Sequence, residues 1–161
     1  MIARRAASVI LAGALALGMS GCSFIATQAT LIPYQPSDGV ATHVGDVKVR
    51  NALGLSTDGT DVAIVMSLIN SGERTIVNFQ YTDADGVKQT ESIYAGEGTT
   101  RIGNLEDDKF ILSNVDVTVG SRIPVYVQTG SEPGEGMLVP IMDGTLPEYA
   151  PLVAPATTDA E

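Results

Sequence analysis

Alternation of apolar and polar residues with a period of two is the feature that most constrains how this chain folds. Val47 and Val49 alternate with Lys48 and Arg50, and the same alternation recurs in later segments. A period of two is typical of strands that bury one face. After Gly39 no segment keeps the 3.6-residue period of an amphipathic helix. The predicted strands span Val47–Leu53, Val62–Ile69, Val77–Tyr81, Val87–Tyr94, Lys109–Thr118, Ile123–Gln128 and Met137–Met142.

About seven short strands separated by turn signals predict an all-β fold, an antiparallel Greek-key sandwich of immunoglobulin-like or cupredoxin-like type. The segment Val62–Ile69 is apolar on both sides, so we expect it in the middle of a sheet. Asp85-Gly86 predicts a hairpin with a type I′ turn. Pro124 and Pro140 cannot donate a ladder hydrogen bond, so they must lie at edges, strand starts or bulges.

The N-terminus has the features of an export signal. Arg4 and Arg5 make its start positive, and residues 6–18 are apolar or small. As a helix this apolar stretch rises only about 20 Å, whereas a stable membrane span needs about 20 residues. We therefore expect residues 1–21 to be a secretory signal peptide, cleaved between Gly21 and Cys22.

The only cysteine of the chain follows directly at the expected cleavage point. Met19-Ser20-Gly21-Cys22 resembles the lipobox of bacterial lipoproteins, usually Leu-Ala/Ser-Gly/Ala-Cys, with Met19 in the position of the leucine. The resemblance implies that the thiol of Cys22 carries a diacylglyceryl group and that acyl chains on Cys22 hold the protein in the lipid bilayer. The predicted location is the extracytoplasmic face of the cell membrane. The alternative is a secreted chain whose Cys22 is free or paired with another molecule.

The 161 residues are enough for one domain. After the signal peptide, residues 22–37 form an uncharged, proline-containing tether that spans at most about 50 Å. Residues 38–146 form the sandwich. Residues 147–161 form a Pro-rich tail that we expect to be extended and disordered at its end, with its first half held to a sheet face through Leu146, Tyr149 and Leu152.

The charge balance excludes several classes of function. Acidic residues outnumber basic ones 19 to 9, a net charge of −10. Without Arg4 and Arg5 the mature chain carries seven basic residues and a net charge of −12. We expect no nucleic-acid partner, because phosphate contacts need concentrated positive charge. One Cys and one His exclude an internal disulfide, a zinc site of paired cysteines and a multi-histidine centre.

No motif of a known catalytic centre is present, so we expect neither an enzyme nor a cofactor. The chain lacks the Gly-x-Ser-x-Gly, Ser-x-x-Lys and His-Glu-x-x-His patterns. His43, just before a predicted strand, is interpreted as a surface residue. Asp83-Ala84-Asp85-Gly86 looks like the start of a calcium loop, but Ser92 stands where that loop needs a Glu. No metal site is predicted, and His43, Asp83 and Asp85 are the side chains that a bound metal would have to use.

The opening of the domain carries a second resemblance. Pro36–Val40 and Val44–Asn51 are similar to the opening of small actinobacterial lipoproteins of uncharacterised role, whose domain is distantly similar to periplasmic copper chaperones. The resemblance covers most of residues 34–153. Those chaperones bind copper through two methionines and two histidines, and a chain with one histidine does not match that set.

We therefore expect a membrane-anchored extracytoplasmic lipoprotein, a non-catalytic binding or scaffold domain that contacts an envelope protein or component. Sandwiches place recognition on loops and exposed edges. The candidate edge is Ile123–Gln128 or Met137–Met142. The alternative function is metal (copper) binding or a chaperone of the cell envelope, with His43 and a methionine or acidic residues as ligands. The predicted partner-contact loop lies between the two candidate edge strands and consists of Gly130, Ser131, Glu132, Pro133, Gly134, Glu135 and Gly136.

Overall fold

The computed structural model describes residues 3, 5–10, 37–103 and 109–154. The chain divides into two compact units, residues 1–34 and 35–161. In the first unit residues 5–10 are helical, and no helix among the described residues has the length and apolarity to cross a bilayer. The predicted cleavage site at Gly21 and Cys22, the lipidation site Cys22 and the tether up to residue 36 lie outside the described residues.

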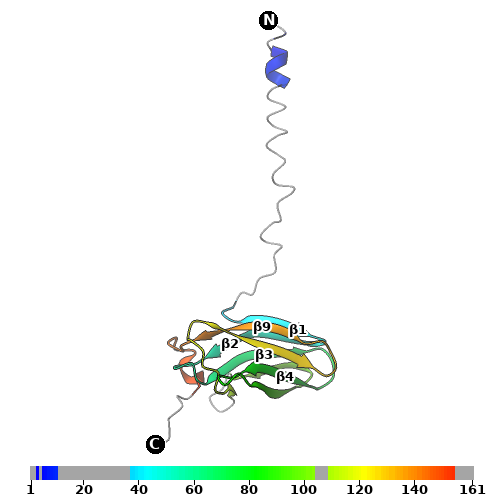
Figure 1. The fold of residues 1–161 in the computed structure, drawn as a ribbon. Coiled ribbons are helices and arrows are strands. Elements are labelled where there is room, and N and C mark those ends of the chain that lie inside the picture. Colours follow the sequence, from blue (N-terminus) through cyan, green and yellow to red (C-terminus); the bar gives the residue numbers. More distant parts are fainter. Residues whose placement is uncertain (1–2, 4, 11–36, 104–108, 155–161) are drawn as a thin grey trace, which may run out of the picture. The chain divides into compact units, whose positions relative to one another are not determined.

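The second unit is built almost entirely of strands, which confirms the predicted all-β sandwich (Figure 1). Described strands number nine rather than about seven, since β1 and β6 lie outside the predicted segments. The strands are β1 (Val40–Val44), β2 (Val47–Leu55), β3 (Val62–Asn70), β4 (Thr75–Thr82), β5 (Lys88–Ala95), β6 (Gly98–Ile102), β7 (Phe110–Leu112), β8 (Arg122–Thr129) and β9 (Glu135–Met142).

The strands form two antiparallel layers that meet along one short seam. Sheet A contains β1, β2, β3, β6 and β7, and sheet B contains β4, β5, β8 and β9. A parallel pairing between β2 and β9 joins the layers, with Gly54 opposite Ile141 and Leu55 opposite Met142. Gly54 permits this approach, because a Cβ there would lie 2.6 Å from side-chain atoms of Ile141 and Val62.

Alternating residues of both sheets meet in one hydrophobic core. β3 lies between β2 on one side and β6 and β7 on the other, which confirms the predicted central position of Val62–Ile69. Phe79 of β4 and Phe110 of β7 form an edge-to-face pair with centroids 5.3 Å apart. The largest fully buried side chains are those of Phe79, Leu53, Leu55, Leu68, Leu112, Ile141, Val47, Val49, Val62, Val77, Val127 and Val139.

One of the two candidate edge strands proves to be interior. β8 pairs with β4 on one side and β9 on the other, so Ile123–Gln128 is not an edge, whereas β9 pairs with β8 along its length and with β2 only at its end. Both prolines lie where a strand has one partner. Pro124 of β8 faces only β9, and Pro140 of β9 faces only β8. The expected positions of the prolines are confirmed, because neither interrupts a two-sided ladder.

The predicted strand Lys109–Thr118 is too long. Only Phe110–Leu112 forms β7, and the chain then turns through Asn114 and Asp116, both with positive φ. The backbone of this segment pairs with a loop rather than a strand, since Val115 N–H donates to Thr60 O at 2.8 Å. The alternation of apolar residues in this segment therefore results from burial against that loop and not from pairing with another strand.

The hairpin between β4 and β5 forms as predicted, but with another turn. A type I′ turn needs positive φ at both central residues. In the turn Asp83–Gly86 only Gly86 has positive φ, at 78°, and Gly86 N–H donates to Asp83 O at 3.0 Å. The carboxylate of Asp83 stabilises the conformation of the turn. It accepts hydrogen bonds from the backbone N–H of Asp85 and Val87 and from the side chain of Gln89.

The C-terminal segment is not extended over its first part. Residues Ala150–Leu152 form a 3-10 helix, and residues 155–161 lie outside the described residues. Tyr149 O–H donates to the carboxylate of Asp38 at 2.8 Å, and Lys109 Nζ donates to Val153 O at 2.7 Å. These bonds attach the segment to the start and the middle of the domain.

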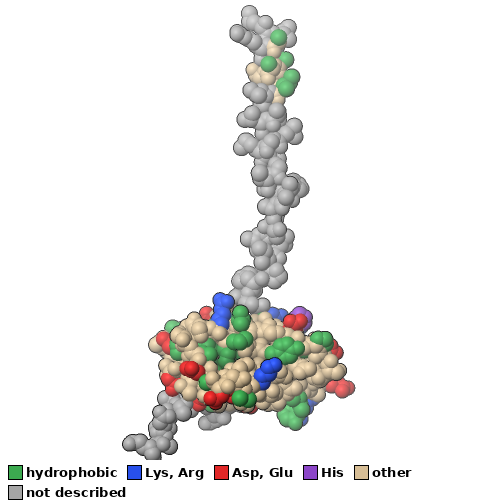
Figure 2. All heavy atoms as spheres, in the orientation of Figure 1, with side chains coloured by type: hydrophobic (Ala, Val, Ile, Leu, Met, Phe, Trp, Pro, Cys, Tyr) green, Lys and Arg blue, Asp and Glu red, His purple; other side chains and the backbone are tan. Residues whose placement is uncertain are grey.

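Charge is distributed unevenly over the second unit. Among the described strands only Glu91 and Glu135 are acidic, and their register partners Phe79 and Val127 point to the core side of sheet B. The remaining described carboxylates lie in turns and loops, and Figure 2 shows acidic side chains mainly around the rim of this unit. The outward-facing positions of the described strands are therefore neutral or cationic.

Candidate groove on the outer face of sheet B

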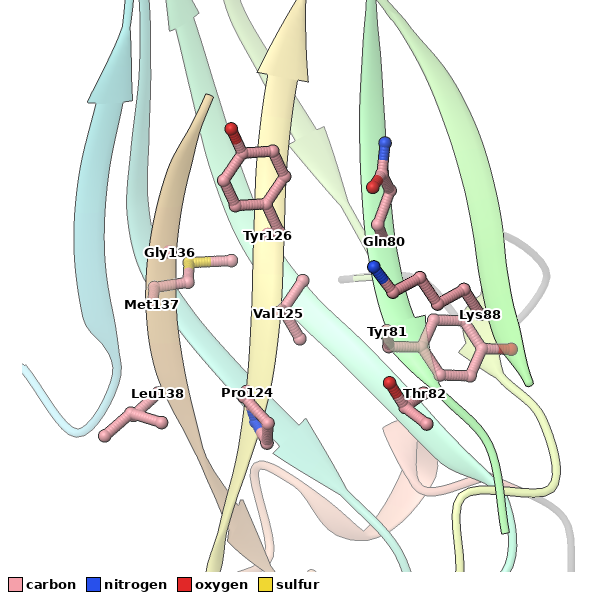
Figure 3. A pocket seen from close by; sticks show the side chains of 10 residues that line it. All are labelled: Gln80, Tyr81, Thr82, Lys88, Pro124, Val125, Tyr126, Gly136, Met137 and Leu138. Atoms are coloured by element: carbon pink, nitrogen blue, oxygen red, sulfur yellow. The ribbon is translucent and has the colours of Figure 1, made fainter. Parts of the chain in front are cut away.

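A groove opens on the outer face of sheet B where β4 and β8 separate (Figure 3). The two strands pair from Val77 opposite Thr129 to Gln80 opposite Tyr126, and the pairing stops there. The cavity has a volume of about 600 Å³. Its lining residues are Gln80, Tyr81, Thr82, Lys88, Pro124, Val125, Tyr126, Gly136, Met137 and Leu138.

Strand alternation decides which residues face the groove. Tyr81, Val125 and Met137 point into the core, so their backbones form the floor. Tyr126 and Leu138 point outward and are large exposed hydrophobic side chains, 42% and 52% exposed. The groove is thus apolar along its β8–β9 side.

The opposite side of the groove is polar. Gln80 and Thr82 of β4 supply an amide and a hydroxyl. In Figure 3 the side chain of Lys88 runs from β5 across β4, so that its ammonium group lies over the groove. Amide, hydroxyl and ammonium groups beside an aromatic ring and a leucine suit a ligand with apolar groups and acceptor oxygens.

Tyr81 holds the end of β4 in place under the groove. Its phenol accepts a hydrogen bond from Ser113 N–H at 3.0 Å and donates one to Ser113 O at 3.3 Å. Burial, more than the nearby carboxylates, raises the pKa of this phenol above its usual range. The side chain is therefore neutral and acts as a structural tie between β4 and the segment after β7.

The predicted contact loop reaches the groove at one end. A Cβ on Gly134 would collide with the ring of Tyr126, so this glycine lets the ring lie against the loop backbone. Gly136 lines the groove. Gly130, Ser131 and Glu132 instead line a separate polar hollow of about 470 Å³ at the end of the sandwich. Within this loop only Gly136 lines the groove, while Gly134 lies against the ring of Tyr126, which does line it.

A further hollow lies on the same outer face of sheet B, near the opposite end of β4. It has a volume of about 680 Å³ and is lined in part by Ile76, Asn78 and Tyr94. The guanidinium of Arg74 lies 4.7 Å from the centre of the Tyr94 ring, a cation–π contact. The outward side chains of β4 thus line both this hollow and the groove.

The side chains considered for a metal are dispersed. His43 lies within β1 and not before a strand, and its hollow of about 310 Å³ is shared with Lys48 and Arg50. The carboxylate of Asp83 is engaged in its own hairpin, and that of Asp85 accepts a hydrogen bond from Asn114. Hydrogen bonding, first from the Gln89 amide, lowers the pKa of Asp83. Among the described residues no group of three His, Cys, Asp or Glu is placed to hold a metal ion.

Comparison with known proteins gives one distant result. No family model matches the chain, and no curated protein matches it. Solved structures with a similar fold include the copper-bound PCuAC domain from PmoF2 and its apo form, each at 13% identity and a TM-score of 0.47. The alignments cover 65% of this chain and 98% and 95% of those domains. The similarity is distant. It transfers no residue role to this chain.

The groove was not predicted from the sequence. Alternation could have indicated that Tyr126 and Leu138 point outward, but only the register shows that β4 and β8 separate beside them. Pro124 was the one local sequence feature that pointed to the groove, because a proline within a strand indicates that the strand lacks a partner on one side.

Proposed function

We propose that the mature chain is a non-catalytic binding protein, held to the extracytoplasmic face of the cell membrane by acyl chains on Cys22. In this proposal the groove on sheet B binds an extended segment of an envelope protein. The observation that supports it is an open groove of about 600 Å³ with exposed apolar side chains at the end of a strand pairing. Exposed large hydrophobic groups gathered beside polar ones mark binding sites on sandwich faces.

The groove favours recognition through side chains. Pro124 has no N–H, so β8 offers no backbone donor at this position to an added strand. Tyr126 and Leu138 suit apolar side chains of the partner, and Lys88 suits a carboxylate beside them. The expected ligand is therefore a segment in which an acidic residue neighbours an aromatic or aliphatic one.

Membrane anchoring and groove binding are tested separately. For the anchor, we expect Cys22→Ala to move the protein from the membrane fraction to the soluble fraction after a high-salt wash, because no acyl chain can be attached. Cys22→Ser is the matched second variant. A Cys22→Ala protein that still sediments with salt-washed membranes would refute the lipid anchor.

For the groove, a photo-crosslinking amino acid is placed at Leu138 and, as the matched control, at Leu146. Both leucines are exposed, 52% and 42%, but Leu146 lies beyond β9 and does not line the groove. On intact cells we expect a discrete crosslinked protein from position 138 that is absent from position 146. Tyr126→Ala in the same chain should abolish that product. Equal products from both leucines would refute the groove as the binding site.

Metal binding is the alternative function from the sequence, and in the described part of the chain no group of three His, Cys, Asp or Glu residues supports it. Lys48 and Arg50 line the hollow that contains His43, and their charges repel a metal cation. We therefore expect calorimetry with Cu(I) to give the same result for the wild type and for His43→Ala. Loss of stoichiometric Cu(I) binding in that variant would establish the alternative.

A further inference from the structure

The outer face of sheet A carries a group of cations that the proposed groove does not use. The cations are Lys48 and Arg50 of β2 and Arg101 of β6, all exposed, and the exposed His43 of β1 and Ile69 of β3, which is 37% exposed, lie beside them. These five residues are called the basic face.

The register places these side chains on one surface. His43 pairs with Lys48, and Lys48 pairs with Ile69. Directly paired residues project to the same side of a sheet. Arg50 and Arg101 both pair with the same residue of β3, so they are two strands apart, about 10 Å across the sheet.

None of these cations is neutralised by the domain itself. Within the described residues, the side chains of Lys48, Arg50 and Arg101 form no ion pair or hydrogen bond. Two other cationic side chains do have partners, because Lys109 donates to Val153 O and Arg74 lies over the ring of Tyr94. The described carboxylates leave these three cations unpaired, and the outward positions of the described strands of sheet A hold no carboxylate.

The acidic residue nearest in sequence to Lys48 lies at the end of the basic face. Asp46 lies in the turn between β1 and β2, and its carboxylate packs beside Gly72, where a Cβ would lie 2.6 Å from Oδ2. The bulges of β1 and β2 also shape this region, with register shifts between Val40 and Thr42 and after Arg50. Bulges at sheet edges re-aim side chains, and here the two strands enclose the hollow beside His43.

We propose that the basic face binds the anionic headgroups of the phospholipids in which the chain is anchored. Charge complementarity carries the proposal, because the outward positions of sheet A join three unpaired cations to an exposed aliphatic side chain. The tether of residues 22–36 permits the contact, since its reach of about 50 Å brings any face of the domain to the bilayer. The proposal rests on the lipid anchor of the proposed function, but its chemistry is tested without acyl chains.

The experiment uses the mature chain, residues 22–161, with Cys22→Ala and therefore no lipid. Vesicles of phosphatidylglycerol and phosphatidylcholine are compared with vesicles of phosphatidylcholine alone by sedimentation at low salt. We expect partition only onto the anionic vesicles, and its loss at high salt. Binding to both kinds of vesicle alike, or to neither, would overturn the proposal. Failure here leaves the anchor test on Cys22 unaffected.

Matched variants distinguish binding through the basic face from binding that depends on net charge alone. Arg50→Gln and Arg122→Gln each remove one positive charge, but Arg122 lies on sheet B. We expect Arg50→Gln to weaken partition about fivefold and the double variant Lys48→Gln/Arg50→Gln about 25-fold, with Arg122→Gln close to the parent. Circular dichroism confirms that the variants are folded. Equal weakening by Arg50→Gln and Arg122→Gln would overturn the proposal, because total charge would then explain binding.

Discussion

The hydroxyl of Tyr81 allows a sharp test of the packing beneath the groove. Tyr81→Phe keeps the buried ring and removes the two hydrogen bonds to the backbone of Ser113. A neutral hydrogen bond contributes about 0.5–1.5 kcal/mol, and the cost of losing it is lower where water replaces the partner. Ser113 is exposed, so water reaches its N–H and C=O. We expect a loss of about 1 kcal/mol, or about 4 °C in Tm for a domain of this size.

A second readout comes from the alkaline side of the stability curve. Burial raises the pKa of Tyr81, so the folded state holds this proton more tightly than the unfolded state. The unfolded state loses it first above pH of about 10, and stability therefore falls as pH rises. Tyr81→Phe removes this contribution, so the free energy of unfolding of the variant should decrease less steeply at alkaline pH. Part of the decline should persist through Tyr149, whose pKa is raised first by its hydrogen bond to Asp38.

The assay is urea unfolding of the Cys22→Ala mature chain at neutral pH and at pH above 10, followed by circular dichroism. Tyr126→Phe is the control, because the hydroxyl of Tyr126 has no hydrogen-bond partner among the described residues. The reasoning is refuted if Tyr81→Phe leaves Tm unchanged, or if its alkaline decline is as steep as that of the wild type.

Two further predictions concern the hairpin and the seam. Asp83→Asn should reduce the loss of stability on acidification below pH of about 4, because the lowered pKa of Asp83 stabilises the fold only while the carboxyl is ionised; acid titration followed by fluorescence of the tyrosines checks this, and an unchanged acid branch contradicts it. Gly54→Ala should cost about 1–3 kcal/mol, because its Cβ meets Ile141 and Val62 at 2.6 Å; a urea midpoint equal to that of the wild type contradicts the packing.

Sequence patterns predicted the architecture where alternation and burial coincide. The two-sided apolar run of β3 identified a central strand, and the two prolines identified places where a strand has one partner. The patterns missed β1 and β6. For β6 the reason is that Gly98–Ile102 is largely polar and is held by backbone pairing to β3. They overextended β7, because burial of Val115 against a loop produces the same alternation as burial in a sheet.

The candidate sites depend on register, which local patterns do not contain. The groove exists because β4 and β8 stop pairing at Gln80 and Tyr126, residues far apart in the chain. The basic face exists because β2 and β6 flank the same residue of β3, although Arg50 and Arg101 lie in separate segments. The contact loop was placed by composition alone, and only Gly134 shows a packing reason for its residue type.

The two prolines have a consequence for the proposed membrane-anchored protein where many copies lie close together. A tethered protein meets its neighbours in two dimensions, where open strand edges readily join into shared sheets. Pro124 lies where β8 pairs only with β9, and Pro140 lies where β9 pairs only with β8, and an imide nitrogen offers no hydrogen to an incoming strand. If acyl chains on Cys22 hold many copies on one membrane, as proposed, an incoming strand finds no backbone donor at Pro124 or at Pro140, and this disfavours a sheet shared between copies at this place.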